Sequence, residues 1–78
     1  MANKIILYTA PGCVYCQMVK DFFKLNNIFY EEKDVSVDEK AREEMVAKSD
    51  QLGVPVIDID GKIVVGFDES AIKELLKL

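Results

Sequence analysis

The chain contains no histidine among its 78 residues and only two cysteines. Without histidine it cannot form the cysteine–histidine dyad that activates many hydrolases. A structural zinc site needs four ligands, and two cysteines without a histidine cannot supply them within one chain. Hydrolase chemistry of this kind and a zinc centre held by a single copy of the chain are therefore excluded, and no metal site is predicted.

Positive charge is also scarce. The chain has 10 basic and 14 acidic residues, which gives a formal net charge of −4. Binding to phosphate backbones requires a surplus of lysine and arginine, so no nucleic-acid partner is expected. Half of the acids, seven, lie between residues 31 and 44. We interpret this segment as a solvated face of the protein rather than a docking patch for a basic partner.

Long apolar runs are absent near the N-terminus. Residues 5–8 form only a short run, whereas a signal peptide needs a longer one and a membrane span needs roughly 20 residues. We therefore expect a cytoplasmic protein without membrane association, in a compartment where thiols stay reduced. No repeat or linker is visible, and the length suits a single domain, 1–78, expected to be monomeric.

The spacing of apolar residues predicts seven secondary-structure elements. In chain order they are a strand at 4–8, a helix at 13–26, a strand at 28–35, a helix at 36–48, strands at 56–59 and 62–65, and a helix after residue 68. Ser36 and Glu39 fit a capping box for the second helix. Asp60 and Gly61 fit a type I′ hairpin turn, and Asp68 can cap the last helix.

This β-α-β-α-β-β-α order predicts an α/β fold. The first β-α-β unit implies parallel strands, and the hairpin adds two antiparallel ones. The result is a four-stranded mixed sheet flanked by three helices, which is the thioredoxin-like layout. The apolar strand 4–8 is expected in the centre of the sheet, and the charged strand 28–35 at an edge. The helix positions expected to face the core are Met18, Val19, Phe22, Phe23, Leu25, Ala41, Met45, Val46, Ala71, Ile72, Leu75 and Leu76.

The two cysteines are separated by two residues at a predicted junction between a strand and a helix. Cys13 opens the helix, so its sulfur lies near unpaired amide N–H groups and the positive end of the helix dipole, which favour the nucleophilic thiolate. Cys16 follows one turn later on the same face and can attack a mixed disulfide at Cys13. This arrangement predicts thiol–disulfide redox chemistry rather than a buried, unreactive pair.

Three motifs, in this order and spacing, resemble the glutaredoxin family, and the similarity runs over residues 5–76. They are Tyr8-Thr9 followed by Cys13-Val14-Tyr15-Cys16, then Val54-Pro55, and finally Gly66-Phe67-Asp68. The resemblance implies a member of the thioredoxin superfamily that reduces disulfides in cell redox homeostasis. In such a protein Cys13 would be the nucleophile and Cys16 the resolving thiol.

The resemblance also implies a groove for glutathione beside Cys13. Pro55 would follow a cis bond and face the disulfide, although an X–Pro bond is by itself more often trans. The backbone of Val54 would pair with the cysteinyl part of glutathione, and Asp68 would hold its γ-glutamyl amine. Tyr15 would line the same groove, and the Gly66-Phe67 element would lie beside it. Glutathione is then a co-substrate, and no cofactor would be bound permanently.

Some positions depart from the family pattern and leave the electron source open. Ala10 and Gly53 stand where glutaredoxins commonly have lysine and threonine, respectively. Phe67 after Gly66 is similar to a motif of the redoxins that serve ribonucleotide reductase and draw electrons from thioredoxin reductase. We favour a glutathione-linked cycle acting on protein disulfides or on mixed disulfides with glutathione. The alternative is a cycle linked to thioredoxin reductase, with ribonucleotide reductase as the protein substrate. A third possibility is a binding module in which two chains share a [2Fe–2S] cluster through Cys13 and glutathione.

Overall fold

The computed structural model of the protein describes residues 4–77. Its elements are β1 (Ile5–Thr9), α1 (Val14–Leu25), β2 (Glu31–Asp34), α2 (Glu39–Ser49), β3 (Val56–Ile59), β4 (Lys62–Val65) and α3 (Glu69–Leu76). The order of strands and helices is the one that the sequence predicts. No helix in the described part of the chain is both long and apolar enough to cross a membrane.

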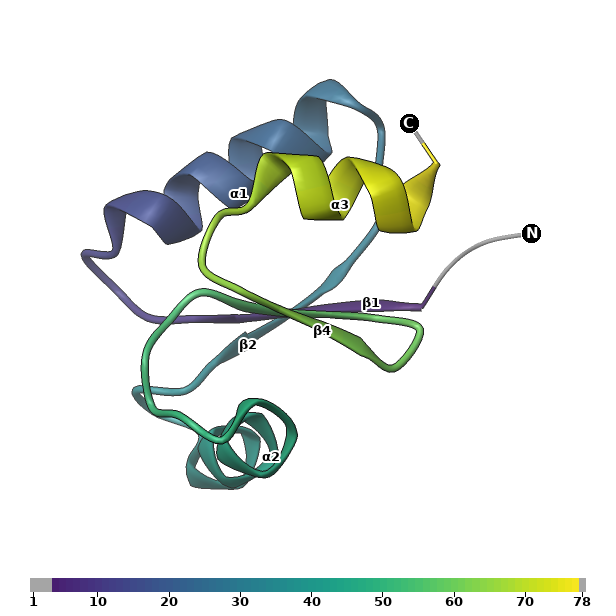
Figure 1. The fold of residues 1–78 in the computed structure, drawn as a ribbon. Helices are drawn as coiled ribbons and strands as arrows, with labels where there is room; N and C mark the ends of the chain where they lie inside the picture. Colours follow the sequence, from purple (N-terminus) through teal and green to yellow (C-terminus); the bar gives the residue numbers. More distant parts are fainter. Residues whose placement is uncertain (1–3, 78) are drawn as a thin grey trace.

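The four strands form one mixed sheet in the order β2-β1-β3-β4. β1 pairs with β2 in parallel, whereas β1 with β3 and β3 with β4 are antiparallel. All five residues of β1 are buried, as expected of a central strand, and the charged β2 lies at an edge. The α1 and α3 helices cover one face of the sheet and α2 covers the other (Figure 1). The loop that carries Cys13 follows β1 and therefore leaves the sheet from an interior strand.

The core has two apolar layers because successive strand residues point to opposite faces of the sheet. Ile5 and Leu7 pack with α1 and α3, whereas Ile6 and Tyr8 pack against α2. The members of the first layer are Ile5, Leu7, Val19, Phe22, Phe23, Ile57, Ile59, Val64 and Ile72, and those of the second are Ile6, Tyr8, Val35, Ala41, Met45 and Val56. The prediction of core positions is confirmed for Val19, Phe22, Phe23, Ala41, Met45 and Ile72.

Other predicted core positions are more exposed than expected. Met18 and Leu25 project from the outer side of α1, and Leu25 is 83 % exposed. Ala71, Leu75 and Leu76 are only partly buried at the margin of the first layer, as α3 buries Ile72 alone completely. The second predicted strand is also shorter than 28–35, because only 31–34 run along β1. The helices cover a small sheet, and each of them therefore buries a narrower stripe of side chains than the periodicity of apolar residues predicts.

A polar network connects α2 to the sheet inside the second layer. The hydroxyl of Tyr8 donates to Glu44 (3.0 Å) and accepts from the Lys48 ammonium (2.8 Å), which also donates to Asp58 (2.7 Å). Tyr8 and Asp58 are buried, and burial raises the pKa of the Tyr8 hydroxyl. These bonds satisfy polar groups that would otherwise be costly to bury, and they fix α2 on the sheet.

The cap of α2 differs from the prediction. Asp38, not Ser36, is the N-cap, and its carboxylate accepts from the Ala41 N–H at 3.0 Å. The Ser36 hydroxyl and N–H instead donate to Asp34, at 2.6 and 2.9 Å, which lowers the pKa of the Asp34 carboxyl. The turn after β2 uses Ser36, so the helix begins two residues later than a capping box at Ser36 would require.

This correction has a stability test. Asp38→Ala is expected to lower the free energy of unfolding by about 1 kcal/mol, since a helix N–H loses its acceptor. Ser36→Ala should have a smaller effect because the exposed Ser36 is not part of the cap. Urea denaturation of both variants measures the difference, and a larger loss for Ser36→Ala would contradict the assignment of the cap.

Candidate active site

The loop between β1 and α1 places Cys13 at the start of the helix. β1 ends at Thr9, and the chain turns through residues 10–12, where Gly12 has a φ of 75°. Cys13 is extended and serves as the N-cap of α1. The helix therefore begins at Val14, one residue later than predicted, and its positive end faces the sulfur of Cys13.

The Cys13 sulfur takes the place that an oxygen acceptor usually has in a helix cap. It accepts from the backbone N–H of Cys16 at 3.2 Å. Its thiol also lies 3.8 Å from the carbonyl oxygen of Val54, to which the S–H donates. Cys13 is partly exposed, and the first turn of α1 holds no acidic residue. The Cys13 sulfur is thus held in place by a helix N–H and stays open to an incoming disulfide.

The Cys16 thiol lies in a different environment. Only 1 % of the residue is exposed, and burial raises the pKa of the thiol, as does its neighbour Cys13. The hydroxyl of Thr9 and the backbone of Ala10 act in the opposite direction and lower the pKa. Thr9 Oγ1 is itself buried and has no other hydrogen-bond partner within residues 4–77, so its hydroxyl is free to donate to the Cys16 thiolate. The two thiols are free in the structure and clearly unequal.

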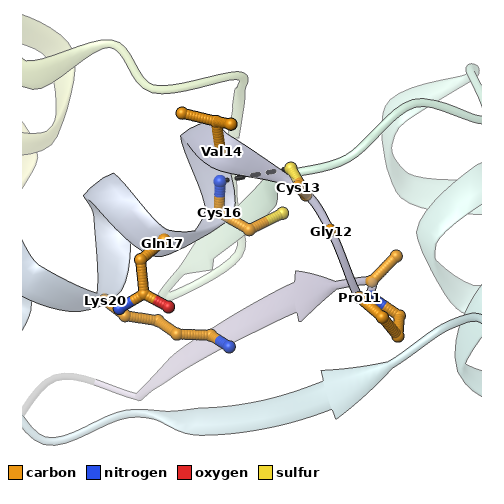
Figure 2. A pocket seen from close by; sticks show the side chains of 8 residues that line it. Pro11, Gly12, Cys13, Val14, Cys16, Gln17 and Lys20 are labelled. Atoms are coloured by element: carbon orange, nitrogen blue, oxygen red, sulfur yellow. Dashed lines mark hydrogen bonds between the residues drawn. The ribbon is translucent and has the colours of Figure 1, made fainter.

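An open pocket of about 440 Å³ lies beside the cysteine pair. It is lined by Ala10, Pro11, Gly12, Cys13, Val14, Cys16, Gln17 and Lys20. Figure 2 shows the side chains of Gln17 and Lys20 on the same side of α1 as the Cys16 thiol. Neither residue was among the predicted site residues. Lys20 follows Cys16 by four residues, and this helical spacing is the signal that could have indicated it.

The second predicted motif also meets the first in space. The bond between Val54 and Pro55 is cis, as the family resemblance implies, and the Val54 carbonyl faces the Cys13 thiol. The N–H of Gly66 donates to the carbonyl of Pro55 at 2.8 Å. The structure therefore brings Cys13, Val54, Pro55 and Gly66 into one continuous set of contacts, although they lie far apart in the sequence.

The remaining predicted site residues have more peripheral positions. Phe67 packs edge-on against Phe22 with ring centroids 5.9 Å apart, so its ring belongs partly to the core. Asp68 is exposed, and one of its carboxylate oxygens caps α3 by accepting from the Ala71 N–H at 3.1 Å. Tyr15 lies in the first turn of α1 and is 60 % exposed.

The match to known proteins agrees with this geometry. The sequence pattern of the glutaredoxin family matches residues 5–64, which is more than half of the chain. The chain belongs to the glutaredoxin family. Membership and fold together support a role as a thiol–disulfide oxidoreductase.

Individual relatives cover nearly all of the chain. A glutaredoxin-like 8.6 kDa protein in the rubredoxin operon of Clostridium pasteurianum is 44 % identical over 73 residues, covering 94 % of this chain and 97 % of that protein. Glutaredoxin 3 of Escherichia coli is 32 % identical over 69 residues, covering 88 % and 82 %. The crystal structure of a thioredoxin-like protein, 42 % identical, superposes with a TM-score of 0.87 over 92 % of this chain and 99 % of that one. The thioredoxin-like fold is thereby confirmed.

Proposed function

We propose that this protein reduces disulfides by dithiol exchange, with Cys13 as the nucleophile and Cys16 as the resolving thiol. The observation that carries the proposal is the asymmetry of the pair. The sulfur of Cys13 is partly exposed and accepts a helix N–H at 3.2 Å, whereas Cys16 is buried one turn behind it and its pKa is raised by burial. An attacking thiolate must reach its substrate, and a resolving thiol needs only to reach its neighbour.

The reaction then has two exchange steps. The Cys13 thiolate attacks one sulfur of a substrate disulfide, the substrate S–S bond breaks, and the departing thiolate takes a proton from water. The Cys16 thiolate next attacks the Cys13 sulfur, which releases the second substrate thiol and leaves a Cys13–Cys16 disulfide. The substrate gains two electrons and the protein loses two, so an external thiol or reductase must restore the dithiol.

Glutathione is the reductant that we favour. The Val54 carbonyl and Pro55 lie beside Cys13, where an extended peptide can pair with the backbone, and Asp68 keeps one carboxylate oxygen free of the helix cap for an amine. The glutaredoxins among the relatives support this choice. Ala10 lines the pocket and carries no positive charge for glutathione. This absence favours thioredoxin reductase as the reductant instead.

A coupled assay distinguishes the two electron sources. With a small disulfide as substrate, NADPH consumption is expected with glutathione and glutathione reductase, and it should be slow or absent with thioredoxin reductase alone. Omitting the protein from each mixture is the control. Turnover only with thioredoxin reductase would assign the protein to the other cycle while leaving the roles of Cys13 and Cys16 intact.

The colour of the purified protein tests the alternative of an iron–sulfur module. We propose that no cofactor is bound permanently. Protein purified without oxygen and with glutathione is therefore expected to be colourless. A brown preparation with visible absorbance that is lost in Cys13→Ser would instead support a cluster shared by two chains.

A further inference from the structure

An ion pair at the sheet edge holds the side chain of Lys20, which lines the same pocket as the buried thiol. Lys20 extends from α1 and lines the same pocket as Cys13 and Cys16 (Figure 2). Its Nζ lies 2.8 Å from a carboxylate oxygen of Glu32 on β2. Both partners are partly exposed, and the lysine more deeply buried than the glutamate. The pair therefore keeps the ammonium on the side of the pocket that faces β2.

The resolving step has an electrostatic difficulty that this charge can relieve. Cys16 must lose its proton before it attacks Cys13, yet burial disfavours its thiolate. Once Cys13 has formed a mixed disulfide, it carries no charge that could oppose the ionisation of Cys16. The burial of Cys16 still opposes it. A fixed cation facing the same pocket stabilises the developing thiolate through space.

The charges around the pocket support a mutual interaction. The Glu32 carboxylate raises the pKa of Lys20, and the Cys16 thiolate adds a smaller contribution in the same direction. Because a Coulombic attraction is mutual, the ammonium favours the Cys16 thiolate, although burial, Cys13, Thr9 and Ala10 have the larger effects on the pKa of that thiol.

Other titratable groups near Lys20 keep one protonation state over the pH range in which thiols titrate. Burial raises the pKa of Tyr30, so this phenol stays neutral, and the Ser36 hydroxyl lowers the pKa of Asp34, so this carboxylate stays charged. A pH profile of the resolving step therefore reports mainly the ionisation of Cys16.

We propose that Lys20 is a positioning residue for the resolving step, which supplies the positive charge that stabilises the Cys16 thiolate within the dithiol mechanism proposed above. Lys20 forms no bond with the substrate and accepts no proton. The proton of Cys16 leaves to water in the open pocket, and the electron pair left on sulfur forms the new S–S bond with Cys13. The Glu32 carboxylate serves to hold the ammonium in place.

Removing the Lys20 charge is expected to slow the resolving step at neutral pH and to accelerate it at alkaline pH. In Lys20→Met the pH midpoint of the resolving step should move upward, because a positive charge that favours the thiolate is lost. For each unit of that movement, the thiolate population below both midpoints falls about tenfold, but the more basic thiolate is a better nucleophile by about threefold. The resolving step should thus become slower at neutral pH and faster at alkaline pH, by about threefold for each unit.

A neutral chromogenic disulfide, dithiodipyridine, separates the two steps. Mixed in excess with reduced protein, it releases one thione when Cys13 attacks and a second when Cys16 resolves. The first phase depends on reagent concentration and the second does not. Cys16→Ser should release only one thione, because one thiol remains. In the unsubstituted protein, a second phase whose rate rises with reagent concentration would mean that Cys16 attacks the reagent and not the Cys13 sulfur, which would overturn the dithiol mechanism itself rather than the role of Lys20.

The variants are measured in this assay across a range of pH. In Lys20→Met the rate of the first phase is expected to stay unchanged. The second phase should be slower than in the unsubstituted protein at neutral pH and faster at alkaline pH. Lys20→Arg should restore the wild-type profile. Lys24→Met removes the same charge one turn further along α1, away from the pocket, and should change neither phase. A second phase in Lys20→Met that is unchanged, or slowed equally at every pH, would overturn the proposal.

Discussion

Replacing Cys13 by serine is expected to abolish both reduction of protein disulfides and removal of glutathione from mixed disulfides. Serine has nearly the same shape, and its hydroxyl can still accept the Cys16 N–H as a helix cap, so the fold should be retained. The hydroxyl does not ionise near neutral pH and cannot attack sulfur, so no mixed disulfide forms. Activity should fall to the uncatalysed rate in both assays, while thermal unfolding confirms that the variant is folded.

Cys16→Ser is the matched variant, and its two activities should separate. Without a resolving thiol, reduction of a protein disulfide stops at the mixed disulfide with Cys13. Removal of glutathione needs only Cys13 and a second molecule of glutathione, so much of this activity should remain. Insulin reduction and release of glutathione from a glutathionylated peptide measure the two activities side by side.

A different outcome for Cys16→Ser would change the assignment of the reductant. Loss of glutathione removal as complete as in Cys13→Ser would mean that glutathione does not reach the site. The absence of a cation at Ala10 would then be decisive, and the cycle linked to thioredoxin reductase would be favoured over the glutathione cycle.

The parts of the fold that the sequence predicts well are those fixed by local chemistry. Asp60 and Gly61 adopt the positive φ angles, 52° and 90°, that the predicted hairpin turn requires. Asp68 caps α3 as expected. The position of Cys13 at a strand-to-helix junction follows from one apolar run and one helical stripe, and it is enough to predict redox chemistry.

Other features depend on contacts between segments and could not be predicted in this way. Both Ser36 and Asp38 are good cap residues, and the choice between them is made by the hydrogen bonds from Ser36 to Asp34 at the end of β2. The sequence offers no means of knowing where β2 stops along β1. It therefore could not rank the two caps.

The pocket shows the same limit at the candidate site. The pairing of Lys20 with Glu32 depends on how α1 lies over the edge strand, because the two residues belong to different elements. Thr9 ends β1 and Cys16 lies in α1, and the loop between them brings the Thr9 hydroxyl close enough to lower the pKa of the Cys16 thiol. The cysteine pair is visible in the sequence, but the groups that control the buried thiol become apparent only in three dimensions.

Alkylation of the reduced protein should distinguish the two thiols strongly. At neutral pH, iodoacetamide is expected to modify Cys13 faster than Cys16, since burial shields the Cys16 sulfur and raises the pKa of its thiol, and each unit of that rise lowers its thiolate population about tenfold. Peptide mapping by mass spectrometry after short labelling times gives both rates. The Cys16→Ser variant serves as the control, because its single thiol should react at the Cys13 rate.

The pH dependence of the labelling gives the sign of the effect. Burial raises the pKa of Cys16, so its labelling should increase mainly at alkaline pH. Denaturation in urea should make the two rates nearly equal, because the helix N–H and the burial are both lost. Faster labelling of Cys16 in the folded, reduced protein would exchange the roles of the two cysteines and would require a substrate to approach from the pocket side of α1.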